Sequence, residues 1–298
     1  MNDLIFNIPK CFYSEEIRNG FKISSEMKHV WAVQLEILSE IIRICEKYKI
    51  KYFAIGGTLL GAARHKGYIP WDDDLDIAMP RFDYDKFCKI APGEFRSPFF
   101  LQTEETDPGY LLRHAKVRNS NTTGILTSQK DNKYQFNQGI FVDIFPLDKL
   151  PDDIDERKVY FNDLYKAWGD VYKYSAYINR NEGCLPENKS LEQIANEARR
   201  LNRQYEELAS KYANTLSREE CILAVTIQSN KIVTSCTWNC VDFDEIEYVP
   251  FEFMRIPIPY KYDNILTKQY GDWRTFVIAD SLHGEVIFNV NKSYKDFI

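Results

Sequence analysis

The stretch from residue 56 to residue 76 places a glycine pair before a short helical segment and then gathers four aspartates within five residues. Side chains alternate between the two sides of an extended chain, so Asp72, Asp74 and Asp76 project to one side and Asp73 to the other. Carboxylates on one side repel each other unless a cation lies between them. Clustered hard oxygen ligands suit Mg²⁺ or Mn²⁺ better than zinc. This stretch therefore predicts a site for a divalent cation.

The residues around this stretch predict helices and strands in alternation. Apolar residues recur at three- and four-residue steps before it, and short apolar runs follow. A strand delivers the chain to Gly56 and Gly57, where glycine permits a tight turn and the close approach of a ligand. The pattern predicts a helix over residues 30–48, a buried strand over 51–55, one to two helical turns over 58–63, and a strand over 74–79.

A later strand carries one isolated carboxylate. Asp143 lies inside an apolar, β-branched run bounded by prolines at its exit. An isolated buried carboxylate is costly and is normally paired or bound to a metal. Asp143 is therefore a third candidate ligand. The other elements predicted up to this point are a helix over 82–90 and strands over 99–102, 111–119 and 139–145.

The second half of the chain has few strand signals. Long helices are predicted over residues 155–177 and 191–212, and Ser190 with Gln193 fits a capping box at the start of the second. A shorter helix is predicted over 262–270, ended by glycine. We therefore expect an α+β fold, with a catalytic core in residues 1–150. Residues 151–298 are expected to form a mainly helical subdomain whose C-terminal segment packs back on the core.

Three carboxylates on two neighbouring strands are suited to metal-assisted phosphoryl transfer. Asp74 and Asp76 are the first pair and Asp143 is the third member, which together can hold one or two cations against nucleotide phosphates. Acidic runs are more often solvated loops, and Asp72 and Asp73 fit that interpretation. The apolar strands around Asp76 and Asp143 make solvation a poor explanation for those two residues.

The glycine turn and two basic stretches are candidates for phosphate binding. Backbone N–H groups at a helix start, with an adjacent hydroxyl, accept anionic oxygens. A glycine pair alone is only a turn, and the basic residues over 111–119 fit an exposed strand face equally well. The candidate phosphate-binding residues are Gly56, Gly57, Thr58, Arg64, Lys116 and Arg118.

Charge and composition exclude several classes of protein. A net charge of −6 argues against general binding to nucleic acid. No apolar run reaches eighteen residues, and the first residues lack the basic and long apolar regions of a secretory signal, so we expect a cytoplasmic protein without a membrane span. Seven scattered cysteines favour reduced thiols over a disulfide framework.

The stretch G-G-T-L-L-G-A-A-R-H-K-G-Y-I-P-W-D-D-D-L-D, with I-A-M-P-R and F-D-Y-D-K-F after it, resembles the signature of the LicD family. Supporting motifs are K-V-R-N-S-N-T-T from Lys116, V-D-I-F-P-L-D from Val142 and Y-G-D-W from Tyr270. The resemblance covers residues 30–150 strongly and the remainder weakly. It implies a nucleotidyltransferase-like mixed sheet flanked by helices.

The resemblance also implies an activity. Members of the family move phosphocholine from CDP-choline to cell-surface glycans, and the related fukutin proteins transfer ribitol phosphate from CDP-ribitol. By this likeness, Gly57 and Thr58 belong to a phosphate turn, and Asp74, Asp76 and Asp143 hold Mg²⁺ or Mn²⁺. The expected partners are a CDP-activated alcohol and a glycan or lipid-linked glycan acceptor, with peripheral membrane contact an open possibility. The alternatives are a nucleotidyltransferase that releases pyrophosphate and a noncatalytic nucleotide-binding regulator.

Overall fold

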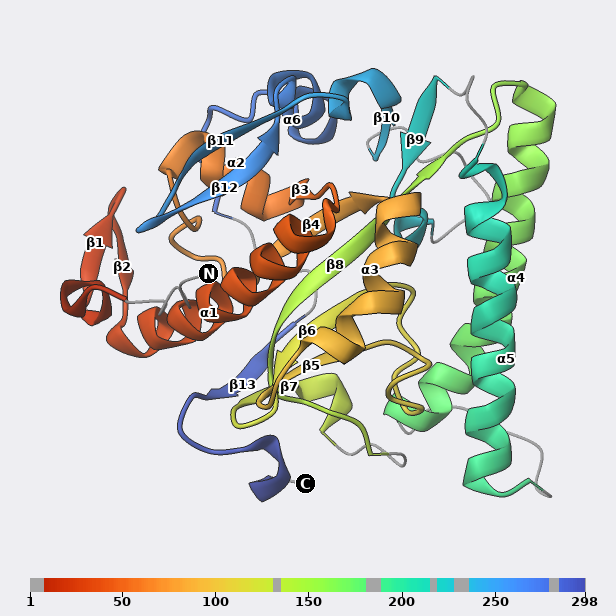
Figure 1. The fold of residues 1–298 in the computed structure, drawn as a ribbon, viewed down its shortest axis with the longest axis horizontal. Helices are drawn as coiled ribbons and strands as arrows, with labels where there is room; N and C mark the ends of the chain where they lie inside the picture. The colour runs from red at the N-terminus through yellow and green to blue at the C-terminus, as the bar shows by residue number, and fades with distance from the viewer. Residues whose placement is uncertain are drawn as a thin grey trace.

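The computed structural model describes residues 8–130, 135–180, 189–214, 219–227, 236–278 and 284–297. At its centre lies a mixed seven-stranded sheet in which the long strand β8 runs parallel to β4 and antiparallel to β6 and β9. The sheet and the helices around it confirm the predicted α+β class (Figure 1). Its strands are β3 (Phe53–Ala54), β4 (Asp76–Pro80), β5 (Phe99–Gln102), β6 (Ala115–Asn119), β8 (Ile140–Lys149), β9 (Glu220–Ile222) and β10 (Thr237–Asn239).

The long helix α1 (Ser25–Tyr48) packs on β6 and β8. Ser24 caps its first turn by accepting a hydrogen bond from the Met27 N–H at 3.1 Å. The buried stripe that includes Trp31 covers the sheet. The prediction of a helix over 30–48 is confirmed, and the Ser24 cap explains its earlier start.

Smaller elements complete the body around the sheet. Buried apolar side chains from Phe12 to Trp273 form one core, so segments from both halves of the chain pack together. Helix α6 has the predicted bounds and ends at Gly271, whose φ is +67°. These elements are α2 (Gly56–His65), α3 (Arg81–Glu94), α6 (Tyr262–Tyr270), and the strand pairs β1 (Glu16–Arg18) with β2 (Phe21–Ile23), β7 (Thr123–Leu126) with β13 (Val286–Asn289), and β11 (Ile246–Phe251) with β12 (Met254–Pro259).

Helices α4 (Ile154–Arg180) and α5 (Leu191–Ala209) lie side by side at one end of the molecule (Figure 1). Ser190 and Gln193 form the predicted capping box at the start of α5. A second apolar core, which includes Phe161 and Tyr205, holds the two helices together. The described 3₁₀ turns are Lys10–Tyr13, Thr127–Gln129, Ser210–Tyr212, Ala224–Thr226, Cys240–Phe243 and Tyr294–Asp296.

Three strand boundaries differ from the predictions. The strand predicted over 74–79 is β4, which begins at Asp76, because the preceding aspartates form a loop. The strand predicted over 111–119 begins at Ala115. The strand predicted to end at Phe145 continues past Pro146 to Lys149, since β4 and then β9 supply partners for its last residues.

The described residues bear on two features of the composition. Six of the seven cysteines are described and have no disulfide bond, while Cys184 lies outside these residues. No helix in the described parts combines the length and the apolar character needed to cross a membrane.

Two glycines predict opposite effects on stability. A Cβ on Gly139 would lie 2.1 Å from the backbone oxygen of Asn119, so Gly139→Ala must push β8 and β6 apart. We expect this variant to lose about 1–3 kcal/mol or more of unfolding free energy. The control is Gly169→Ala on α4, where a Cβ meets nothing within 4 Å and a gain of about 0.5–1 kcal/mol is expected. Urea unfolding of both variants checks this, and a Gly139→Ala protein as stable as wild type would contradict it.

Candidate functional site

The glycine pair brings the start of α2 up against the aspartates. Helix α2 begins immediately after β3 at Gly56, whose φ is +58°. A Cβ on Gly57 would lie only 2.6 Å from Asp72 Oδ2, and one on Gly56 would lie 3.5 Å from Asp76 Oδ2. The absence of a side chain at Gly57 therefore permits the close approach of Asp72, while Gly56 is favoured by its positive φ. The first turn of a helix has N–H groups without helical partners, so the turn offers donors for oxygen ligands beside the carboxylates.

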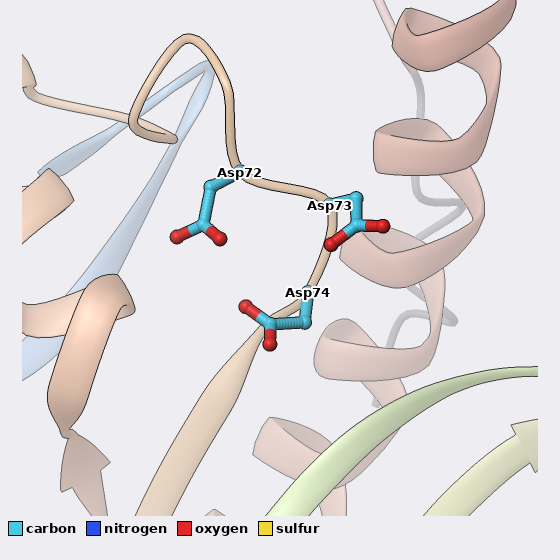
Figure 2. Close-up of side chains that lie close together, drawn as sticks. All are labelled: Asp72, Asp73 and Asp74. Carbon is cyan, nitrogen blue, oxygen red and sulfur yellow. The ribbon is translucent and has the colours of Figure 1, made fainter. Parts of the chain in front are cut away.

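The aspartate loop presents its carboxylates to two sides. Figure 2 shows Asp72 and Asp74 turned to one side of the backbone and Asp73 turned to the other, the arrangement that alternation along an extended chain produces. One oxygen from each of the three lies within 4.8 Å of the others. Helix α1 fixes the loop from beneath: Trp31 Nε1 donates to the Asp72 carbonyl at 3.0 Å, and Gln34 Nε2 donates to the Asp73 carbonyl at 2.7 Å.

Asp76 stands at the start of β4, directly opposite Asp143 on the parallel strand β8. Its N–H donates to Thr58 Oγ1 at 2.8 Å, so the buried hydroxyl of α2 positions the acid. Burial raises the pKa of Asp76 well above its usual range, and the charges of Asp74 and Asp143 raise it further. The carboxylates around Asp76 therefore outnumber the basic side chains near them. This excess of negative charge favours the binding of a cation.

Asp143 also contacts two basic side chains, one on β6 and one just before it. The Lys116 ammonium forms an ion pair with Asp143 Oδ1, and His114 Nε2 lies 3.1 Å from the same oxygen. Burial by itself would raise the pKa of Asp143, but Lys116 and His114 outweigh it and hold the pKa well below its usual range. The Asp143 N–H donates to the Leu75 carbonyl at 2.9 Å, which ties β8 to the end of the aspartate loop. Asp143 is thus a fixed, charged carboxylate.

The predicted metal ligands lie on the aspartate loop and on the two paired strands that follow it. Asp74 belongs to the loop cluster, and Asp76 and Asp143 lie next to it on paired strands. Within the described residues, the tight carboxylate group is Asp72, Asp73 and Asp74 rather than the predicted three. The concentration of aspartates in the sequence indicated a cation site that could include Asp72 and Asp73. They were assigned to a solvated loop instead, although both lie close to Asp74.

The basic side chains predicted to bind phosphate form hydrogen bonds to other groups of the protein instead. Arg64 Nη1 donates to the carbonyls of Trp273 at 2.8 Å and Thr275 at 3.0 Å. Arg118 Nη1 donates to the Gly139 carbonyl at 2.6 Å, and its Nε hydrogen-bonds to the side chain of Gln102.

The alternative of an exposed cationic strand face is wrong. Arg113, which precedes β6, and Lys116 and Arg118 within it are all buried. Their charges are offset inside the protein rather than by solvent.

Tyr270 lies near the acids without having been predicted there. Its phenol accepts a hydrogen bond from Gln269 Nε2 at 3.2 Å. Burial raises its pKa, and the charges of Asp76 and Asp72 raise it further. The motif Y-G-D-W was a signal that the residue matters, but nothing local in the sequence relates it to residues 72–76.

Comparison with known proteins relates this sequence to one family. The family model for the LicD/FKTN/FKRP nucleotidyltransferase domain matches residues 49–179, the interval that contains every predicted site residue. Over 122 residues the chain is 38% identical to the lipopolysaccharide cholinephosphotransferase LicD of Haemophilus influenzae, covering 41% of this chain and 44% of that protein. It is 30% identical over 181 residues to an uncharacterized protein of Rickettsia prowazekii, covering 60% of this chain and 55% of that protein.

A shorter match extends the relationship. Over 39 residues the chain is 44% identical to the human ribitol 5-phosphate transferase FKRP, covering 13% of this chain and 8% of that protein. The matches therefore span about half the length of the bacterial relatives and a small part of the human one.

Proposed function

We propose that the protein transfers a phospho-alcohol, such as phosphocholine, from a CDP-activated donor to a hydroxyl of a glycan or glycan precursor. The reaction would release CMP. The starting point is that residues 49–179 match the model of the LicD/FKTN/FKRP nucleotidyltransferase domain. The observation that carries the proposal is the pairing of Asp76 with Asp143 beside the Asp72–Asp74 cluster, against the glycine start of α2. The names of the LicD and FKRP relatives support the reaction class.

The donor set fits a hard divalent cation. The cluster of described residues offers three carboxylate oxygens, and the pKa of Asp76 is raised first by burial and then by the charges of Asp74 and Asp143, which a cation would offset. We propose that Asp74, Asp76 and Asp143 hold Mg²⁺ or Mn²⁺, with Asp72 beside them. When bound, the cation supplies charge stabilisation for the diphosphate of the donor.

The protein groups around the acids have distinct proposed roles. The first N–H groups of α2, at Gly56 and Gly57, hold phosphate oxygens of the donor. Thr58 keeps Asp76 in place through the hydrogen bond from the Asp76 N–H. Asp143, with its lowered pKa, is a poor proton acceptor and serves as a charged ligand instead.

The proposal predicts which product appears in solution. Incubation with CDP-choline, CDP-ethanolamine or CDP-ribitol, Mg²⁺ and a glycan acceptor should release CMP with at least one donor. EDTA should abolish the release, and added Mg²⁺ should restore it. Chromatography of the nucleotide products measures both effects.

Two other results would replace the proposal. Release of pyrophosphate from a nucleoside triphosphate, without CMP from any CDP-alcohol, would identify a nucleotidyltransferase. Binding of a CDP-alcohol without turnover across a broad acceptor panel would identify a regulator.

A further inference from the structure

One oxygen of Asp143 is held by two basic side chains. Lys116 lies opposite Asp143 in the antiparallel register of β6 and β8, and its ammonium pairs with Oδ1. His114 Nε2 reaches the same atom at 3.1 Å. The side chains of Lys116 and Asp143 are 4% and 10% exposed, so water screens their interaction weakly.

The ammonium of Lys116 depends on this carboxylate. Its Nζ lies 3.6 Å from the centre of the Phe141 ring, which contributes a weaker attraction. A buried ammonium is costly without an opposite charge beside it. Burial lowers the pKa of Lys116, and Asp143 is the leading influence that opposes this. The two side chains therefore stabilise each other's charged form.

The same carboxylate faces the proposed metal site. Asp143 pairs with Asp76 across β4 and β8, and its charge acts on Asp76 together with that of Asp74. Two cations that share one carboxylate repel each other strongly at such short range. Lys116 and a divalent cation therefore compete for Asp143.

We infer that Lys116 is an internal counter-ion of the metal site, which occupies Asp143 before a divalent cation binds and gives it up when the cation arrives. This inference rests on the proposed function and deepens it. Once released from Asp143, the ammonium stands at the edge of the site, where it can contact a phosphate oxygen of the donor. In this way Lys116 can pair with Asp143 in the metal-free protein and still take the phosphate-binding role predicted from the sequence.

Metal affinity distinguishes this role from simple positioning. If Lys116 competes with the cation, Lys116→Met should bind Mn²⁺ about tenfold more tightly than wild type. If Lys116 instead orients Asp143 as a ligand, the variant should bind Mn²⁺ more weakly. Titration of the metal-free chain, following free Mn²⁺ by electron paramagnetic resonance without any donor, measures this affinity.

Matched variants control for charge and folding. Lys166→Met removes the same charge from the exposed side of α4 and should leave Mn²⁺ affinity unchanged. Lys116→Gln keeps a hydrogen-bond donor without the charge, and it should also bind more tightly, which keeps the test valid if Lys116→Met does not fold. The gain should disappear in Lys116→Met combined with Asp143→Asn, because the contested ligand is then neutral.

The outcomes separate this inference from the proposed reaction. Tighter Mn²⁺ binding in both Lys116 variants supports the counter-ion role even if no CDP-alcohol releases CMP. Unchanged or weaker binding in the folded variants overturns it even if CMP release is observed.

Discussion

Asp76→Asn is expected to reduce CMP release by about 10²-fold or more while making the metal-free protein more stable. The activity falls because the variant loses a charged ligand next to Asp143. The stability rises because a buried carboxylate, repelled by Asp74 and Asp143, becomes neutral. An opposite sign for activity and stability is typical of a residue whose charge serves function at a cost to the fold.

The pH dependence of stability has a definite sign. Because the folded state raises the pKa of Asp76, it binds the proton more tightly than the unfolded chain does. The stability of the metal-free wild type should therefore fall as pH rises through the folded pKa of Asp76. Asp76→Asn should lack this part of the loss.

Thermal unfolding in EDTA and assays of CMP release in Mg²⁺ measure the two effects. Asp170→Asn is the control, since Asp170 pairs with Lys173 on the exposed side of α4. This control should change stability by no more than about 0.5 kcal/mol and leave turnover intact. Near-normal turnover in Asp76→Asn, with the metal still required, would reject the role of Asp76.

Arg81→Met is expected to destabilise the protein by about 3–5 kcal/mol. Arg81 binds Asp148 through two hydrogen bonds of 2.6 and 2.8 Å and binds Glu206 on α5 at 2.8 Å. Arg81 and Asp148 are almost fully buried. Removing the guanidinium leaves the buried Asp148 and the partly exposed Glu206 without their cation, and it also removes a link between α5 and the sheet.

This loss should depend on pH. Burial raises the pKa of Glu206 to about 7 even with Arg81 in place. A raised folded pKa means that stability falls as pH rises through this range. Without Arg81 the pKa of Glu206 and that of Asp148 rise further, so the deficit should be larger at about pH 8 than at about pH 5.5.

Urea unfolding at both pH values measures the deficit. The control is Arg43→Met, whose guanidinium is 44% exposed and pairs with Glu40 at the surface. A cost of at most about 1 kcal/mol is expected there. An Arg81→Met deficit no larger than that of the control would show that the buried ion pairs contribute little.

The periodic elements were predictable from sequence because local signals specify them. The capping box at Ser190 and the glycine after Tyr270 set helix ends within a few residues of the chain. The isolated carboxylate Asp143 in an apolar strand likewise indicated a buried partner. In each case the relevant physics lies within one element.

The partners of the site residues were not predictable, because they come from distant parts of the chain. Alternation along β6 predicts that Lys116 and Arg118 share a face, but not that β5 and β8 cover the strand on both edges. The carbonyls that bind Arg64 lie more than 200 residues away, at Trp273 and Thr275. Strand register and long-range packing determine these contacts. The local spacing of residues in the sequence predicts neither of them.

The anchoring of the aspartate loop by Trp31 and Gln34 has a consequence for fragments of this protein. Both side chains belong to α1, which ends before residue 49, where the match to the family begins. A truncated protein covering only residues 49–179 would retain all five acids but lose the helix that positions the aspartate loop. The interval that matches the family is therefore shorter than the unit that forms the site, and expression of residues 49–179 alone should yield a chain in which the site is not formed.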